Sequence, residues 1–331
     1  ENVLIRTESG VVEIFDQYGG TSAADTQDGI EYIHYRWQNV FGTSTTRRFQ
    51  ISSESEVFTG TQTGDGRSEF FFGTRGDDSV FGAGGDDMIF TGAGDDRVSG
   101  GTGVDHIVAS RGRNTLDGGS SGDVYYWNAF HTARNLIEES ETSDTDALVA
   151  AFLVSDLVDA RIAGGGPQRD LVLDFATARF ASSELGSRFR IEDHFSRDDD
   201  FRGIEHLRFD GTWYATQTDF DRTGTAENDF IVAPSGRGLR LVARAGDDAV
   251  FAGDRKDRVL GGRGDDVLDA GDGDDRAKGG GGDDVLRGGD GGDRLVGGGG
   301  ADAADYRGSG RGVSVDLDEG LDRTIAFYRS R

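Results

Sequence analysis

The sequence contains no cysteine, only two prolines, and far fewer basic than acidic residues. Disulfides are therefore absent, and the composition is not that of a proline-rich linker. No stretch approaches the roughly 18 apolar residues of a membrane-spanning helix. The 35 Lys and Arg against 61 Asp and Glu give a formal net charge of −26. Because binding to phosphate backbones needs a basic face, this excludes nucleic acid as a natural partner and favours multivalent cations.

Glycine is abundant, at 54 of 331 residues, far above its usual share. An acidic, glycine-rich chain could be a disordered tail, but 21 Phe and regularly placed Val, Ile and Leu argue against that. A folded chain of this kind that lacks disulfides needs another stabilising link, and a bound metal ion is the obvious candidate. Since the sequence opens on Glu1 without a visible signal peptide, we expect it to be a fragment of a larger protein.

Two stretches repeat the frame G-x-x-G-x-D-x-U-x every nine residues, where U is a large apolar residue. The first covers residues 64–126, with units such as GTRGDDSVF and GAGGDDMIF. The second begins near Gly224, slips by one residue around Pro234, and keeps strict register from Ala243 to Asp305. Its eighth position is apolar throughout. A solvated low-complexity segment would show no such phase, so we expect folded repeats.

These units resemble the haemolysin-type calcium-binding repeat of RTX (repeats-in-toxin) proteins, whose consensus is G-G-x-G-x-D-x-U-x. The resemblance implies that six residues of each unit form a calcium-binding turn and three form a short strand. Two units then complete one coil of a parallel β-roll. The fold it implies is all-β, with two parallel β-rolls joined by β-rich connecting modules.

The segments outside the arrays also resemble each other. Gly29–Tyr35 and Gly203–Phe209 share a Gly-Ile-Glu start, and the second continues into Asp210-Gly211-Thr212-Trp213. Both are similar to the connecting module found beside RTX arrays, although the first copy lacks the Asp-Gly-Thr turn. The predicted parts are a partial module at 1–59, the first roll at 60–126, a module at 127–222, the second roll at 223–306, and a tail or start of the next module at 307–331.

The repeat chemistry suits Ca²⁺, a hard ion that takes six to eight oxygen ligands. Glycine allows φ > 0, so backbone carbonyls can converge on one point, and the aspartate at the sixth position adds charge. The candidate carboxylate ligands are Asp78, Asp87, Asp96, Asp105, Asp248, Asp257, Asp266, Asp275, Asp284, Asp293 and Asp302. The candidate turn glycines are Gly82, Gly84, Gly100, Gly261, Gly279, Gly281, Gly297 and Gly299.

In a coil of two units, aspartates eighteen residues apart stack, and two carboxylates neutralise one Ca²⁺. The second array then has columns of four and three aspartates, hence about five sites between them. The first array stacks Asp78 with Asp96 and Asp87 with Asp105. Several edge positions depart from the pattern, namely Glu69 and Asn114 in place of Asp, and Arg67, Ser121 and Arg255 in place of a turn glycine.

Positions seven and nine face outward when position eight faces inward. In the first array this predicts an apolar patch that includes Phe72 and Phe90. We expect the module at 127–222 to cover it, with a partner protein as the alternative.

The second array has a polar exterior by the same rule. It carries Arg258, Arg276 and Arg294 at eighteen-residue spacing. This stripe is either a solvated ladder paired with local aspartates or a binding site for an acidic glycan or other partner.

No catalytic motif stands out. Gly118–Gly122 matches G-x-S-x-G but falls in repeat phase, without a strand–elbow–helix context. There is no H-E-x-x-H, and the five histidines have no ligand spacing. We therefore expect no enzyme activity in this chain.

The RTX resemblance implies a secreted, extracellular bacterial protein, associated with the cell surface, that is exported unfolded by type I secretion and folds on Ca²⁺. Its expected role is a structural or adhesive scaffold with a protein or glycan partner on a cell surface or matrix. The alternative is the accessory region of a toxin, protease, lipase or epimerase whose active domain lies outside this chain.

Overall fold

In the computed structural model, the regular secondary structure of the described residues is almost entirely β-strand, with one short 3₁₀ helix. The described residues are 3–7, 10–14, 32–38, 44–50, 61–109, 111–127, 133–139, 145–150, 152–163, 169–175, 187–192, 194, 204–216, 223–305 and 314–316, the first four ranges and the last as backbone only. The expected modules at 1–59 and 307–331 therefore lie largely outside the described residues. Within the described part, no helix is long and apolar enough to cross a membrane.

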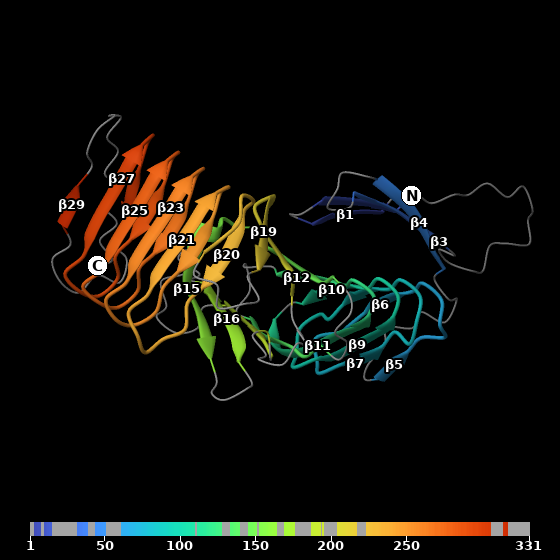
Figure 1. Ribbon diagram of the computed structural model, residues 1–331. Coiled ribbons are helices and arrows are strands. Elements are labelled where there is room, and N and C mark those ends of the chain that lie inside the picture. The colour runs from blue at the N-terminus through green and yellow to red at the C-terminus, as the bar shows by residue number, and fades with distance from the viewer. Residues whose placement is uncertain are drawn as a thin grey trace, which may run out of the picture. The chain divides into compact units, whose positions relative to one another are not determined.

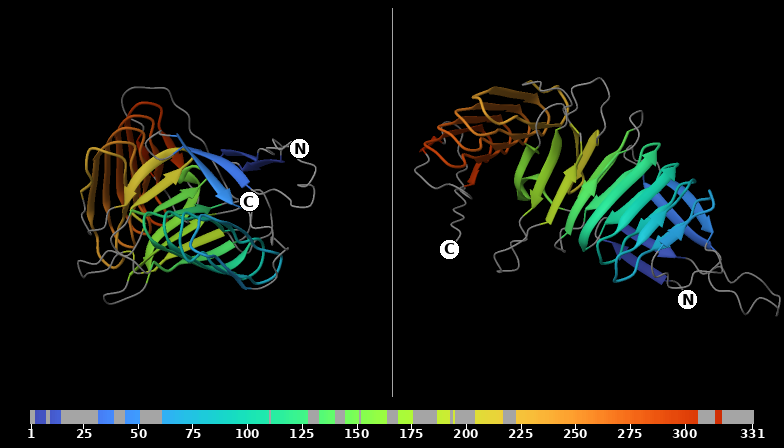
Figure 2. Two further views of the ribbon diagram at one scale, coloured as in Figure 1. Left: turned by 90° about the vertical axis from the view of Figure 1, so that its right-hand side faces the viewer. Right: turned by 90° about the horizontal axis from the view of Figure 1, so that it is seen from below.

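The chain divides into two compact units, residues 1–144 and 145–331. The first unit holds two antiparallel pairs and a parallel roll (Figure 2). The pairs are β1 (Val3–Thr7) with β2 (Gly10–Ile14) and β3 (Tyr32–Gln38) with β4 (Ser44–Gln50).

The first roll has two parallel sheets whose strands alternate along the chain. One contains β6 (Phe70–Phe72), β8 (Met88–Phe90), β10 (His106–Ala109) and β12 (Val124–Trp127). The other contains β5 (Thr61–Thr63), β7 (Ser79–Phe81), β9 (Arg97–Thr102), β11 (Gly112–Ser120) and β13 (Ala133–Ile137).

The register confirms the predicted coil of two units. Phe70 pairs with Met88, and Ser79 pairs with Arg97, each eighteen residues apart. The core consists of the eighth positions, all at most 1% exposed from the second unit onward: Val80, Ile89, Val98, Ile107, Leu116 and Tyr125. The predicted apolar patch is only partly covered, because Met88 is buried while Phe72 is 45% exposed. That the module at 127–222 covers it stays a prediction.

The second roll repeats this arrangement more regularly (Figure 1). One sheet contains β20 (Asp229–Val232), β22 (Ala249–Phe251), β24 (Val267–Asp269), β26 (Val285–Arg287) and β28 (Ala303–Asp305). The other contains β21 (Arg240–Ala245), β23 (Arg258–Arg263), β25 (Arg276–Gly281), β27 (Arg294–Gly299) and β29 (Ser314–Asp316). The slip near Pro234 is confirmed, since Phe230 pairs with Ala249 nineteen residues on, whereas Ala249 pairs with Val267.

The segment before the second roll continues its sheet. β14 (Ala147–Ala150) pairs in parallel with β18 (His206–Phe209), which forms a hairpin with β19 (Thr212–Thr216), and β19 pairs in parallel with β20. The hairpin loop is the Asp210-Gly211 pair, with φ of 42° and 90°. Positive φ at both residues is what a tight type I′ turn requires. The Asp-Gly-Thr sequence thus marks this hairpin correctly.

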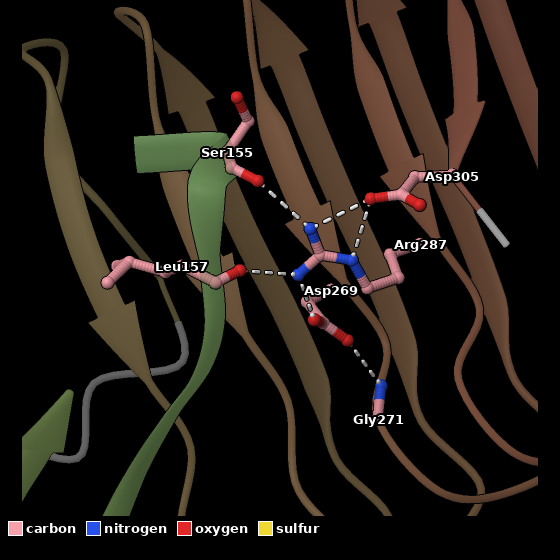
Figure 3. A network of polar contacts seen from close by, with 6 residues as sticks. All are labelled: Ser155, Leu157, Asp269, Gly271, Arg287 and Asp305. Carbon is pink, nitrogen blue, oxygen red and sulfur yellow. Dashed lines mark hydrogen bonds and ion pairs between the residues drawn. The ribbon is translucent and has the colours of Figure 1, made fainter. Parts of the chain in front are cut away.

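A set of three antiparallel strands follows a different course. It contains β15 (Leu157–Ala163), β16 (Asp170–Phe175) and β17 (Ser187–Ile191), and a short 3₁₀ helix (Val154–Asp156) leads into β15. This segment reaches the outer face of the second roll through Arg287 (Figure 3). The Arg287 guanidinium donates to the carbonyl oxygens of Ser155 and Leu157, each at 3.1 Å.

Arg287 sits between two aspartates of the same outer column. It forms ion pairs with Asp269 at 2.7 Å and Asp305 at 3.0 Å, and its side chain is 6% exposed. Phe251, in the same column, is also buried. The outer column of this sheet thus carries charged residues, as a polar exterior requires, but at Arg287 these charges are paired and buried against residues 155–157 and not exposed to solvent.

Candidate calcium sites

The sixth-position aspartates lie in the turns, each just before a strand. Each carboxylate is held by the backbone of the preceding coil. In the main column, the amide of Asp248 donates to Oδ1 of Asp266 (2.9 Å), Asp266 donates to Asp284 (3.0 Å), and Asp284 donates to Asp302 (3.1 Å). The predicted stacking at eighteen-residue intervals is thereby confirmed for this column.

The other columns follow the same rule. The backbone amide of Asp257 donates to Oδ1 of Asp275 at 2.6 Å, and the amide of Asp275 donates to Oδ1 of Asp293 at 3.0 Å. In the first roll, the pairs Asp78–Asp96 and Asp87–Asp105 are joined at 3.0 and 2.7 Å. The structure thus brings together all eleven predicted aspartates in columns, while their role as metal ligands stays a prediction.

The second oxygen of these carboxylates decides what the turns can bind. It is buried and accepts no hydrogen bond within the described part of the chain in Asp87, Asp105, Asp248, Asp266, Asp275, Asp284 and Asp293. A buried anionic oxygen without a partner is strongly unfavourable in a protein interior. A regular series of such oxygens therefore points to cations as the missing partners.

The electrostatics of the turns lead to the same conclusion. Burial raises the pKa of Asp87 to about 8 and the pKa of Asp266 and Asp284 to about 7, against an ordinary 3.8, and neighbouring carboxylates add to the effect. The pKa of Asp248 and Asp275 is raised to about 7 for the same reasons. The columns are thus poorly suited to carry negative charge unless a cation neutralises it.

The first glycine of each unit leaves room beside the carboxylate. A Cβ on Gly261 would lie 2.2 Å from Oδ2 of Asp266 and 2.8 Å from the carbonyl oxygen of Gly279 in the next coil. Gly82, Gly100, Gly279 and Gly297 face the Oδ2 of their own unit in the same way, at 2.1–2.2 Å. A carboxylate oxygen and a backbone carbonyl thus border one small space, which is the donor set that Ca²⁺ prefers.

The third-position glycines behave differently. A Cβ on Gly281 or Gly299 would meet nothing within 4 Å, and one on Gly84 would meet Oγ1 of Thr102. These three predicted residues therefore do not border the carboxylate.

Sequence reasoning missed two aspartates that continue the columns. Asp123 accepts from the amide of Asp105 at 2.7 Å, and Asp229 donates to Asp248 at 2.8 Å. Both are fully buried. The repeat pattern does indicate both aspartates, since each occupies the sixth position of a degraded unit.

In the first full turn of each array, donors of the same unit bond to the second carboxylate oxygen of the sixth-position aspartate, and we call this a closed turn. In the first roll, the amide of Thr74 donates to Oδ2 of Asp78 at 2.6 Å and its hydroxyl donates at 3.0 Å. In the second roll, Thr225 and Asp229 repeat this arrangement at 2.6 and 3.1 Å. Threonine replaces the second glycine in both units, so protein donors occupy the oxygen that is left open elsewhere.

At the C-terminal end of the first roll, amides replace the carboxylates. Oδ1 of Asn114 accepts from the amide of Asp96 at 3.1 Å, and its Nδ2 donates to Asn135 at 2.8 Å. At the opposite edge, Glu69 is capped by the amide of Asp65 at 3.0 Å. These departures from the consensus lie at the ends of the columns, where a neutral or closed pair needs no ion.

No group of three or more His, Cys, Asp or Glu side chains gathers around one point in the described ranges. The columns instead offer two carboxylates per gap plus backbone carbonyls. A family model described as the RTX calcium-binding nonapeptide repeat matches four copies, at residues 63–98, 99–127, 242–277 and 269–304. The chain therefore contains RTX calcium-binding nonapeptide repeats. Its RTX copies coincide with the two rolls, and a comparison with curated proteins gave no match.

Proposed function

We propose that this chain is the calcium-folded scaffold of a secreted bacterial RTX protein, with a structural or adhesive role at the cell surface. The observation that carries the proposal is the series of buried, unpartnered carboxylate oxygens in the turns of both rolls. Without a cation, the stacked carboxylates within each column repel one another, and the glycine-rich turns lose much conformational entropy on folding. Ca²⁺ supplies the neutralising charge and the coordination that the protein leaves open.

The expected affinity range connects this chemistry to location. Extracellular calcium modules bind with dissociation constants of about 10⁻⁴–10⁻³ M. Sites of that strength are empty in the cytosol and filled outside the cell. The chain would thus stay unfolded for type I export and fold on arrival.

We also propose that the chain works without catalysis. The G-x-S-x-G match at 118–122 spans the end of β11 and the following turn, where it serves the repeat. Burial lowers the pKa of His194 to about 3, so its imidazole is too weak a base for general-base catalysis near neutral pH. Both features favour structural roles for the residues that first suggest chemistry.

Circular dichroism of the full chain tests the calcium proposal. We expect the β signal to fall when a chelator removes calcium, to return when excess Ca²⁺ is added, and not to return with the same concentration of Mg²⁺, which demands a tighter octahedral shell. An unchanged β signal in chelator would refute calcium-coupled folding.

A further inference from the structure

The sheet of the second roll that residues 155–157 do not reach carries a column of arginines. Arg240, Arg258, Arg276 and Arg294 pair in register on β21, β23, β25 and β27, and all four are exposed. These strands lie side by side in Figure 1. Since neighbouring strands are about 4.8 Å apart, the four side chains start from a straight row with that spacing.

Local aspartates do not explain the column. Arg240, Arg258 and Arg276 form no ion pair with any described residue. The aspartates nearest in sequence are engaged in the turns, where Asp257 accepts from the amide of Leu239 and Asp275 accepts from Asp257. Among the described residues, the guanidinium groups of Arg240, Arg258 and Arg276 thus have no carboxylate partner, although the chain has a net charge of −26.

An apolar strip runs beside the arginines. Val242, Leu260 and Val296 occupy the parallel outward column and are half-buried, with exposed Lys278 between Leu260 and Val296. The surface therefore offers a repeating pair of groups, one cationic and one mostly apolar, on each successive strand.

We infer that this face binds a linear acidic polysaccharide with a carboxylate or sulfate on successive sugar units. The planar guanidinium fork matches such anions in a bidentate manner. A row of evenly spaced cations fits a polymer with evenly spaced anions, and the apolar strip suits the C–H faces of sugar rings. The inference rests on the proposed extracellular role, where such polymers occur, and it names the class of partner.

A second copy of the chain is the competing occupant. The fifth-position aspartates Asp265 and Asp283 are also exposed and eighteen residues apart. Their Oδ1 atoms already accept amides of the following coil, at 2.7 Å in each case. Because these carboxylates are already engaged in the turns, self-association is the less favourable solution.

The test uses the calcium-loaded full chain and a short oligogalacturonate, below the length at which calcium cross-links such chains. Calorimetry should give salt-dependent binding to this probe and none to a neutral oligosaccharide of equal length. The double variant Arg258→Gln/Arg276→Gln should bind about tenfold more weakly or worse, because two charged contacts are lost. The matched control Arg97→Gln/Arg113→Gln removes two exposed charges from the first roll and should bind as the parent does.

Circular dichroism in calcium must first show that both variants are folded, which separates this inference from the proposed folding function. Equal binding by the Arg258→Gln/Arg276→Gln variant and its control would overturn the inference, as would absence of binding by the parent chain. Sedimentation distinguishes the competing occupant. Salt-sensitive self-association that is lost only in Arg258→Gln/Arg276→Gln, without oligosaccharide binding, would assign the column to a second copy and overturn the inference.

Discussion

Replacing Asp266 with Asn should have opposite effects on stability with and without calcium. Asp266 is in the middle of its column, where its carboxylate accepts from the amide of Asp248 and its amide donates to Asp284, so we expect it to contribute to the sites on both sides. Asn keeps the Oδ1 acceptor for the amide of Asp248 but removes the charge. One bound ion stabilises a fold by about 2.7 kcal/mol when free ligand is 100-fold above its dissociation constant. Loss of two sites therefore costs about 5 kcal/mol under those conditions.

Without calcium the sign reverses. Burial and the neighbouring carboxylates raise the pKa of Asp266 to about 7, so its charge destabilises the metal-free roll. Asn at this position relieves that penalty, and the calcium-free variant should be more stable than the parent chain. Urea denaturation monitored by circular dichroism, in calcium and in chelator, measures both effects.

The neighbouring variant Asp265→Asn is the matched control. Asp265 is exposed and its Oδ1 accepts from the amide of Asp283 at 2.7 Å, an acceptor that Asn also retains. The same chemical change one residue away should leave the calcium dependence unaltered. If Asp266→Asn and Asp265→Asn shift the midpoints equally in calcium, the assignment of the sixth position as the ligand is incorrect.

Three further predictions follow from individual contacts. Arg287→Ala removes the ion-pair partner of buried Asp269 and should destabilise the second unit by about 3–5 kcal/mol in thermal or urea unfolding, whereas exposed Arg276→Ala should have little effect. Thr225→Gly opens the closed turn at Asp229 and should add one calcium to the stoichiometry measured by calorimetry; an unchanged count would contradict the closed-turn reading. In the calcium-free chain, the pKa is raised to about 8 for Asp87 and to about 7 for Asp248. These carboxyl groups therefore bind protons in the folded state at a pH where the unfolded state does not. The free energy of unfolding should thus rise as the pH falls from about 8 toward about 5. A β signal in chelator that weakens on acidification over that range would contradict this prediction.

Much of the roll could be predicted because its information is local and periodic. The nine-residue phase fixes which residue enters the core, and Val259 and Leu268 are fully buried as that phase requires. The same phase places the aspartates in columns, and even the slip near Pro234 is legible in the sequence. Asp123 and Asp229 were missed only because their units lack the full glycine pattern.

Other features depend on contacts that no period encodes. Arg287 occupies an outward position like that of any solvated arginine, and only the approach of residues 155–157 makes it a buried anchor. Likewise, the closed turns at Thr74 and Thr225 follow from a single side chain that supplies a hydroxyl and turns its amide inward. These are long-range or stereochemical effects, which composition and spacing do not reveal.

Amide hydrogen exchange of the full chain, read by peptide mass spectrometry, tests the central claim most directly. In calcium, peptides from 61–127 and 223–305 should be strongly protected, because most of their strands are paired with a neighbour on both sides. After chelation, protection in both ranges should be lost, and added Ca²⁺ should restore it. Equal protection of these ranges in calcium and in chelator would contradict the account, because the carboxylate columns would then hold their fold without the ion.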